Sequence, residues 1–170
     1  KIFCENGRFR IGKRIIREAD SQHAQGTITV SEILAVSSNI GTSKIALKMG
    51  DNKIMQGLQQ FGFGERTGID LPGEAKGITV RLPWSDHLLA NVSFGHGITT
   101  TPLQIANAFA VIANGGVLNR PYIVDSITDV ESGEVSKTEV KQIRRVISEE
   151  TAAQMRLMLA GATSEGGTGM

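Results

Sequence analysis

Ser37, Ser38 and Asn39 place two hydroxyls and an amide side by side in an otherwise apolar stretch. A hydroxyl can both donate and accept a hydrogen bond, so it can pass on a proton without taking a formal charge. An amide offers fixed donors and an acceptor, and at a helix junction such groups could fill a cleft. A simpler interpretation is that Ser37 caps a second helix and Asn39 occupies its first turn.

Two predicted helices flank this triplet. Thr29 and Glu32 have the spacing of a capping box, and the apolar residues at 33, 34 and 36 form one helical face. Apolar residues at helical spacing resume after Asn39 and continue to Gly50, a residue type that commonly ends helices. The triplet is therefore expected at the junction of the two helices.

The rest of the chain alternates between loops, short strands and helices. Residues 1–28 and 62–84 are expected to be extended or loop, and Asp51 is expected to cap a helix that ends at Gly62. Thr101 and Gln104 form a second capping box, and the helix that follows is expected to bury the apolar residues at 105, 108, 109 and 112. A hairpin around 131–134 and a final helix capped by Ser148 complete the prediction.

Composition describes an ordinary globular piece with one sizeable core. The 170 residues are 40% hydrophobic with a net charge of +1, which gives no reason to expect a nucleic-acid partner. The basic segment Lys1 to Arg17 is interpreted as a solvated strand pair. Cys4 is the only cysteine, so an internal disulfide is impossible, and we expect it to be a small apolar core residue.

The other residues that could do chemistry have simpler interpretations. His23 and His87 have no Cys or acidic neighbour at metal-ligand spacing, so no metal site is predicted. His96 lies between two glycines, which favours a turn over a functional histidine. Lys44 is expected to be a solvated helix lysine.

Four segments in order resemble penicillin-binding transpeptidases of the monofunctional class B type that acts in division or elongation. These segments cover residues 31–46, 61–74, 93–104 and 113–121, and their sequences are SEILAVSSNIGTSKIA, FGFGERTGIDLPGE, SFGHGITTTPLQ and ANGGVLNRP. The likeness spans nearly the whole chain. It implies an α/β (α+β) fold, namely the predominantly helical part of a penicillin-binding/β-lactamase-like transpeptidase domain, with a C-terminal hairpin contributing to its sheet.

The resemblance also implies roles for the triplet. Ser37 matches the family serine that relays a proton between a catalytic lysine and the leaving amine. Asn39 matches the residue whose amide holds that lysine and donates to the substrate backbone. No cofactor is implied, and the implied partners are the D-Ala-D-Ala end of a peptidoglycan stem peptide, β-lactam antibiotics and other cell-wall synthesis proteins. The family location is the periplasmic face of the inner membrane, reached here through an anchor outside this chain.

Two family motifs are absent from these 170 residues. No serine is followed three places later by lysine, and the Gly-Thr-Gly run at 167–169 has no lysine before it. We therefore expect residues 1–170 to be a single partial domain that is inactive by itself. Ile33, Leu34, Ile40 and Leu47 are then expected to face the missing material. Two alternatives stay open: a β-lactam sensor or hydrolase on the same fold, and a non-enzymatic interaction module without the nucleophile.

Overall fold

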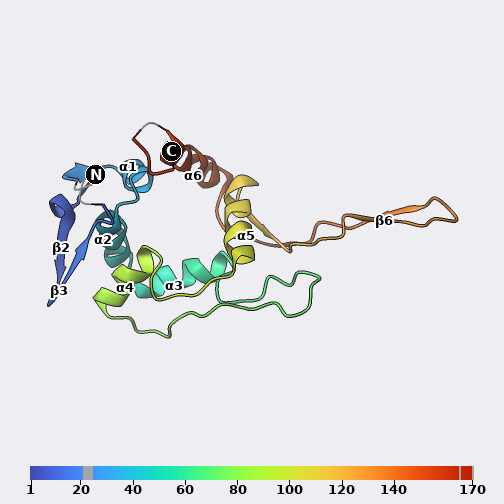
Figure 1. The fold of residues 1–170 in the computed structure, drawn as a ribbon, viewed down its shortest axis with the longest axis horizontal. Helices are drawn as coiled ribbons and strands as arrows, with labels where there is room; N and C mark the ends of the chain where they lie inside the picture. Colours follow the sequence, from blue (N-terminus) through green and yellow to red (C-terminus); the bar gives the residue numbers. More distant parts are fainter. Residues whose placement is uncertain (21–24, 165, 170) are drawn as a thin grey trace.

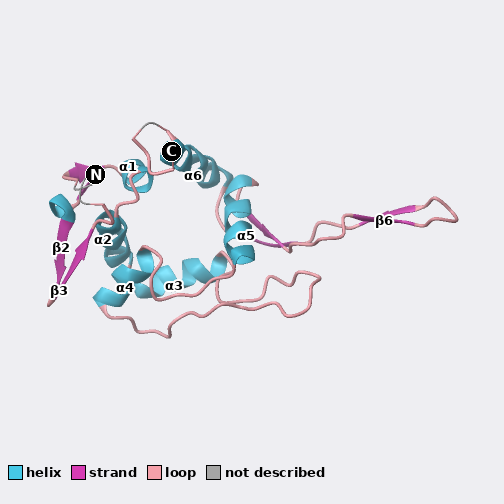
Figure 2. Cartoon of the chain, in the orientation of Figure 1, coloured by secondary structure: helices cyan, strands magenta, loops and turns pink. Residues whose placement is uncertain are grey.

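A computed structural model describes residues 1–20, 25–164 and 166–169. In Figure 1 the helices follow one another around a ring, with a short hairpin at one side and a long projecting hairpin at the other. The helices are α1 (Val30–Ala35), α2 (Asn39–Met49), α3 (Asp51–Gln60), α4 (Asp86–Ser93), α5 (Pro102–Ala113) and α6 (Glu149–Ala160), with 3₁₀ turns η1 (Glu5–Gly7) and η3 (Gly161–Thr163). Figure 2 shows the predominance of helix and loop over strand.

The strands pair into small antiparallel sheets of two. Near the N-terminus β1 (Ile2–Phe3) pairs with β4 (Thr27–Ile28), and β2 (Arg8–Ile11) pairs with β3 (Arg14–Arg17). Later in the chain β5 (Val117–Asn119) pairs with β8 (Gln142–Arg145), and β6 (Ser126–Thr128) with β7 (Val135–Lys137). The predicted C-terminal hairpin is thus present as a sheet of its own that projects from the ring (Figure 1). The mixed, mostly helical fold class is confirmed.

Capping signals predicted the helix starts well. Both capping boxes form as expected, at Thr29 and at Thr101, and Ser148 caps α6. The prediction for Asp51 was wrong by one position, because Gly50 is the N-cap of α3. The Asp51 carboxylate instead accepts hydrogen bonds from the backbone N–H groups of Asn52 and, at 2.9 Å, Trp84.

Two apolar clusters hold the helices together. The first joins the N-terminal strands to α1, α2 and α4, and the second joins α2 and α3 to α4 and Trp84. Their buried members are Cys4, Ile16, Ile28, Ile33, Ile40 and Ala90, and then Ala46, Met55, Trp84, Leu89 and Val92. Cys4 is therefore an apolar core residue, as expected. Ile33 and Ile40 were expected to face missing material, but both are fully buried in the first cluster.

The buried face of α5 also differs from the prediction. Ile105 and Phe109 are 44% and 57% exposed, whereas Gln104 and Val111 are buried. Almost every side chain of this helix is apolar, so the periodicity does not say which face packs against the rest of the chain. On the buried face, Gln104 Nε2 donates to the carbonyls of Glu65 and Lys76.

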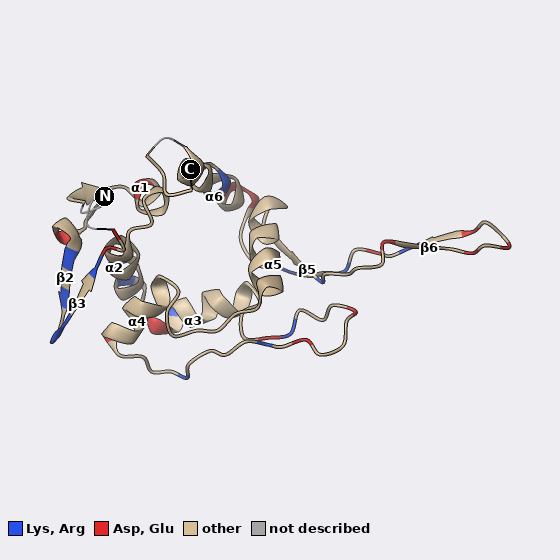
Figure 3. Ribbon diagram, in the orientation of Figure 1, with Lys and Arg blue, Asp and Glu red and all other residues tan. Residues whose placement is uncertain are grey.

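The basic N-terminal segment is the predicted solvated strand pair. Figure 3 marks the Lys and Arg positions along β2 and β3 in blue on the ribbon. Arg8 lies directly opposite Arg17 in the pairing, and Ile16 on the other face of β3 is buried. The hairpin thus presents charge to solvent and packs one apolar side chain against the helices.

Candidate functional site

Ser37 occupies the sharp turn between α1 and α2. Its backbone has φ = 52°, in the left-handed region that residues other than glycine seldom adopt. Its N–H donates to the Leu34 carbonyl at 3.3 Å, and the next N–H, of Ser38, donates to the Ile33 carbonyl at 3.0 Å. The Ser37 side chain is exposed and has no hydrogen-bond partner among the described residues. Its hydroxyl is therefore free to meet another group.

Ser38, and not Ser37, is the N-cap of α2. Its Oγ accepts the Gly41 N–H at 2.9 Å and donates to Glu18 Oε1 at 2.7 Å. The side chain is 1% exposed. The interpretation of Ser37 as the cap was wrong by one residue, and this shift leaves the Ser37 hydroxyl uncommitted.

Asn39 is the first residue of α2, within the first turn as the helix-cap interpretation predicted. Its Nδ2 donates to the Arg17 carbonyl at 3.0 Å, and its backbone N–H donates to Glu18 Oε2 at 2.6 Å. An amide carries two N–H donors and a carbonyl. The bond to Arg17 therefore fixes the side chain and leaves one N–H and the amide oxygen for a ligand.

The triplet lines a pocket where α1, α2 and α4 meet. Its volume is about 170 Å³, and its lining residues are Ile33, Leu34, Ser37, Ser38, Asn39, Thr42, Ser93 and Phe94. Close packing of α1 against α2 shapes it: a Cβ added to Gly41 would come within 2.6 Å of Ile33 Cγ1. The predicted helix-junction cleft with fixed polar groups is therefore present.

Lys44 differs from its prediction. Its Nζ pairs with Glu5 Oε1 at 2.5 Å and donates to the Phe3 carbonyl at 2.7 Å. The same ammonium lies 4.9 Å from the centroid of the Phe9 ring. Lys44 is therefore not a solvated helix lysine, because it ties the N-terminal segment to α2. Sequence spacing could not indicate partners this far away along the chain.

His96 and His87 contact neighbouring groups of the fold. The His96 backbone N–H donates to the Asn91 carbonyl at 2.9 Å, and its exposed ring lies edge-on to Phe94 at 5.2 Å. The ring of His87 lies within 3.3 Å of an Arg14 nitrogen. His23 lies outside the described residues. Within those residues, no cluster of His, Cys, Asp and Glu could hold a metal ion.

Burial raises the pKa of the Cys4 thiol, and the nearby carboxylates of Glu18 and Glu5 act in the same direction. Hydrogen bonding from Ser38 and the charge of Lys44 oppose this rise only in part. A thiol that stays protonated is a weak nucleophile. Cys4 is therefore an apolar core residue that contacts Ser38.

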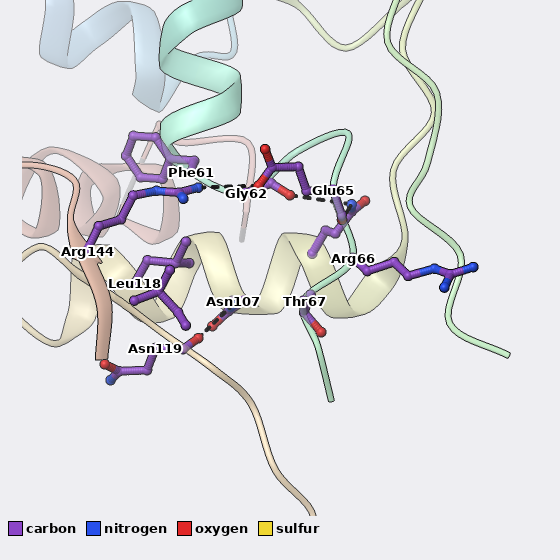
Figure 4. Close-up of a pocket in the computed structure, with 11 residues that line it drawn as sticks. Phe61, Gly62, Glu65, Arg66, Thr67, Asn107, Leu118, Asn119 and Arg144 are labelled. Carbon is purple, nitrogen blue, oxygen red and sulfur yellow. Dashed lines mark hydrogen bonds and ion pairs between the residues drawn. The ribbon is translucent and has the colours of Figure 1, made fainter. Parts of the chain in front are cut away.

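A second polar pocket, of about 100 Å³, lies between α5, β5 and the loop after α3 (Figure 4). Gln104 donates from Nε2 to the carbonyls of Glu65 and Lys76, at 2.7 and 2.9 Å. Arg144 donates to the last carbonyls of α3, and Asn107 to the Asn119 carbonyl. The Gln104 bonds fasten the 62–77 loop to α5, whereas the Arg144 bonds join β8 to α3 and the Asn107 bond joins α5 to β5. The sequence indicated Gln104 only as part of a capping box.

The comparison with protein families decides what this arrangement belongs to. The family model described as "Penicillin binding protein transpeptidase domain" matches residues 1–170. The chain belongs to the penicillin-binding protein transpeptidase family. The predicted resemblance is therefore confirmed over its whole length.

Individual relatives of this transpeptidase chain are PBP3- and FtsI-like class B proteins. "Penicillin-binding protein PbpB" of Mycolicibacterium smegmatis is 35% identical over 89% of the chain and 23% of the relative. "Peptidoglycan D,D-transpeptidase FtsI" of Escherichia coli K12 is 36% identical over 63% of the chain and 18% of the relative. The chain thus spans about a quarter or less of the curated relatives it matches.

A solved relative shares the fold of the transpeptidase chain. Penicillin-binding protein 3 of Mycobacterium tuberculosis, in complex with aztreonam, has a TM-score of 0.78 and 31% identity over 90% of this chain and 34% of that one. The same protein has also been solved with ampicillin. The relatives therefore include a protein that binds β-lactams.

Proposed function

We propose that this chain is part of a peptidoglycan D,D-transpeptidase that cross-links stem peptides through a serine acyl-enzyme and is acylated by β-lactams. The observation that carries the proposal is the exposed, uncommitted Ser37 hydroxyl at a pocket, two residues before an amide held in place at Asn39. The family membership, the relative named as a D,D-transpeptidase and the β-lactam complexes of another relative support it.

The reaction needs a nucleophile that these 170 residues do not contain in a Ser-x-x-Lys setting. In the proposed mechanism a serine outside the chain attacks the penultimate D-Ala carbonyl carbon after its lysine partner takes the proton. The C–N bond to the terminal D-Ala then breaks, and the departing amine needs a proton. Ser37 relays that proton from the lysine, because a hydroxyl accepts one proton as it donates another.

Asn39 is proposed to position the lysine and the substrate. Its bond to the Arg17 carbonyl sets the orientation of the amide at the pocket wall. The remaining N–H can donate to a peptide carbonyl and the amide oxygen can accept from an ammonium. An Asp at this position could accept but not donate, so it would lose the substrate contact.

The proposed location of the whole protein is the periplasmic face of the inner membrane, with other cell-wall synthesis proteins as partners. None of the helices among the described residues could cross a membrane by its length and hydropathy. We propose that any anchor lies outside these residues, as the family resemblance implies.

The test is the rate at which the intact protein is acylated by a fluorescent penicillin. Ser37→Ala should slow acylation about 10²- to 10⁴-fold, the range for losing a positioned proton-transfer group, and Asn39→Ala and Asn39→Asp should also slow it. Ser31→Ala, which alters an exposed serine on α1, is the matched control and should react at the wild-type rate.

Two results would overturn the proposal. A well-folded Ser37→Ala protein that reacts at the wild-type rate would return the triplet to a purely structural role. Rapid release of hydrolysed penicillin from the wild-type protein would favour a hydrolase on the same fold, because a transpeptidase should keep its β-lactam adduct.

A further inference from the structure

The carboxylate of Glu18 joins the residue after β3 to the start of α2. Oε1 accepts from the Ser38 hydroxyl at 2.7 Å, and Oε2 accepts from the Asn39 backbone N–H at 2.6 Å. Both carboxylate oxygens are thus used on two consecutive residues. The negative charge also lies at the N-terminus of an eleven-residue helix, where the helix dipole stabilises an anion.

These contacts act directly on the backbone that follows Ser37. A serine with φ = 52° is in a sparsely populated region, and it stays there only if its surroundings determine the conformation. On one side the turn is held by the bond from the Ser37 N–H to α1. On the other side it is held through Ser38 and Asn39 by Glu18 and by the carbonyl of its neighbour Arg17.

Glu18 follows strand β3, which is packed against the core. Ile16, two residues earlier, is 5% exposed and belongs to the same core cluster as Ile33 and Ile40, which flank the triplet. The β2–β3 pairing runs from Arg8 opposite Arg17 to the turn, so Glu18 directly follows the last paired residue of β3. The half-buried side chain therefore has a fixed base and two short bonds.

We propose that Glu18 is a positioning residue for the Ser37 and Asn39 site, through which the N-terminal hairpin sets the geometry of acylation. Glu18 does not touch substrate in this role. The proposal rests on the proposed function. It predicts that loss of the carboxylate lets Ser37 and Asn39 move, and a displacement near 1 Å can cost roughly 10²-fold in rate.

The experiment compares Glu18→Ala, Glu18→Gln and Glu18→Asp in the intact protein with Glu74→Ala as the control. Glu74 is matched in its bonding, because its carboxylate also accepts from a hydroxyl and a backbone N–H, both of Thr67 at 2.6 Å. It acts in the 62–77 loop and lines no part of the Ser37 pocket. Melting temperature, the first-order acylation step and the dissociation constant before acylation are measured for each variant.

Glu18→Ala should lower the first-order acylation step by about 10- to 100-fold and change the prior dissociation constant far less. The acylation step of Glu18→Gln should lie between those of Glu18→Ala and wild type, because an amide has only one acceptor oxygen for the two donors. Glu18→Asp should restore part of the rate. Glu74→Ala should keep the wild-type acylation step even at an equal loss in melting temperature. An equal fall in the acylation step of both variants would show a general stability effect and overturn the proposal.

Hydrogen exchange gives a readout that does not depend on activity. The Asn39 and Gly41 amides should exchange faster in Glu18→Ala than in wild type, and not in Glu74→Ala. Unchanged exchange at both amides would overturn the positioning role even if the wild-type protein proved not to react with penicillin. A wild-type protein that does not react would instead count against the proposed function alone.

Discussion

Ser38→Ala should destabilise the protein by about 2 kcal/mol, because one buried hydroxyl makes two separate contributions. Loss of the cap to the Gly41 N–H costs about 1 kcal/mol, the usual value for an N-cap serine. Loss of the bond to Glu18 adds about 1 kcal/mol, the value of a typical neutral hydrogen bond and below that for a charged partner, because water can reach the half-buried carboxylate.

Thermal unfolding of the intact protein measures this loss against a second capping serine. Ser85 caps α4 through the Leu88 N–H at 3.3 Å, and its hydroxyl is exposed. Ser85→Ala should therefore cost only the cap, about 1 kcal/mol. The shift in melting temperature for Ser38→Ala should be about twice as large, and equal shifts would refute the account of Ser38 as a link between α2 and Glu18.

Three further predictions concern the supports around the site. Lys44→Met should cost about 1–2 kcal/mol and speed hydrogen exchange in residues 2–9, because the ammonium ties this segment to α2. Gln104→Leu should cost about 3 kcal/mol and expose the 62–77 loop to limited proteolysis, since several backbone groups lose their partner. Burial opposes ionisation of Glu74, but hydrogen bonds from Thr67 and Gly68 outweigh burial and hold the pKa of this carboxyl below its ordinary 4.5. The resulting stabilisation of the fold is complete above pH 4.5 and is lost as pH falls through the folded-state pKa. Glu74→Gln should therefore flatten the acid side of the plot of melting temperature against pH.

Local signals in the sequence predicted local structure. The capping boxes at Thr29 and Thr101 use residues only three positions apart, so their geometry follows from the sequence itself. The hairpin around 131–134 was found for the same reason. The position of the Ser37 triplet at a helix junction also followed from the pattern, although the choice between Ser37 and Ser38 as the cap did not.

Long-range partners could not be predicted. Glu18 lies about twenty positions before Ser38, and Lys44 finds Glu5 across 39 positions. Neither pairing follows the helix or strand periodicity by which contacts can be predicted from sequence. The apolar surface of α5 is a related case, because Ile105 and Val111 look alike in sequence and only the packing of neighbouring elements separates exposed from buried.

The most direct test of the central claim is to locate the β-lactam adduct in the intact protein by peptide mass spectrometry. We propose that Ser37 relays a proton and that a serine outside residues 1–170 is the nucleophile. We therefore expect one stoichiometric adduct, on a peptide outside this range. A stoichiometric adduct on Ser37, or on any other serine within residues 1–170, would contradict it.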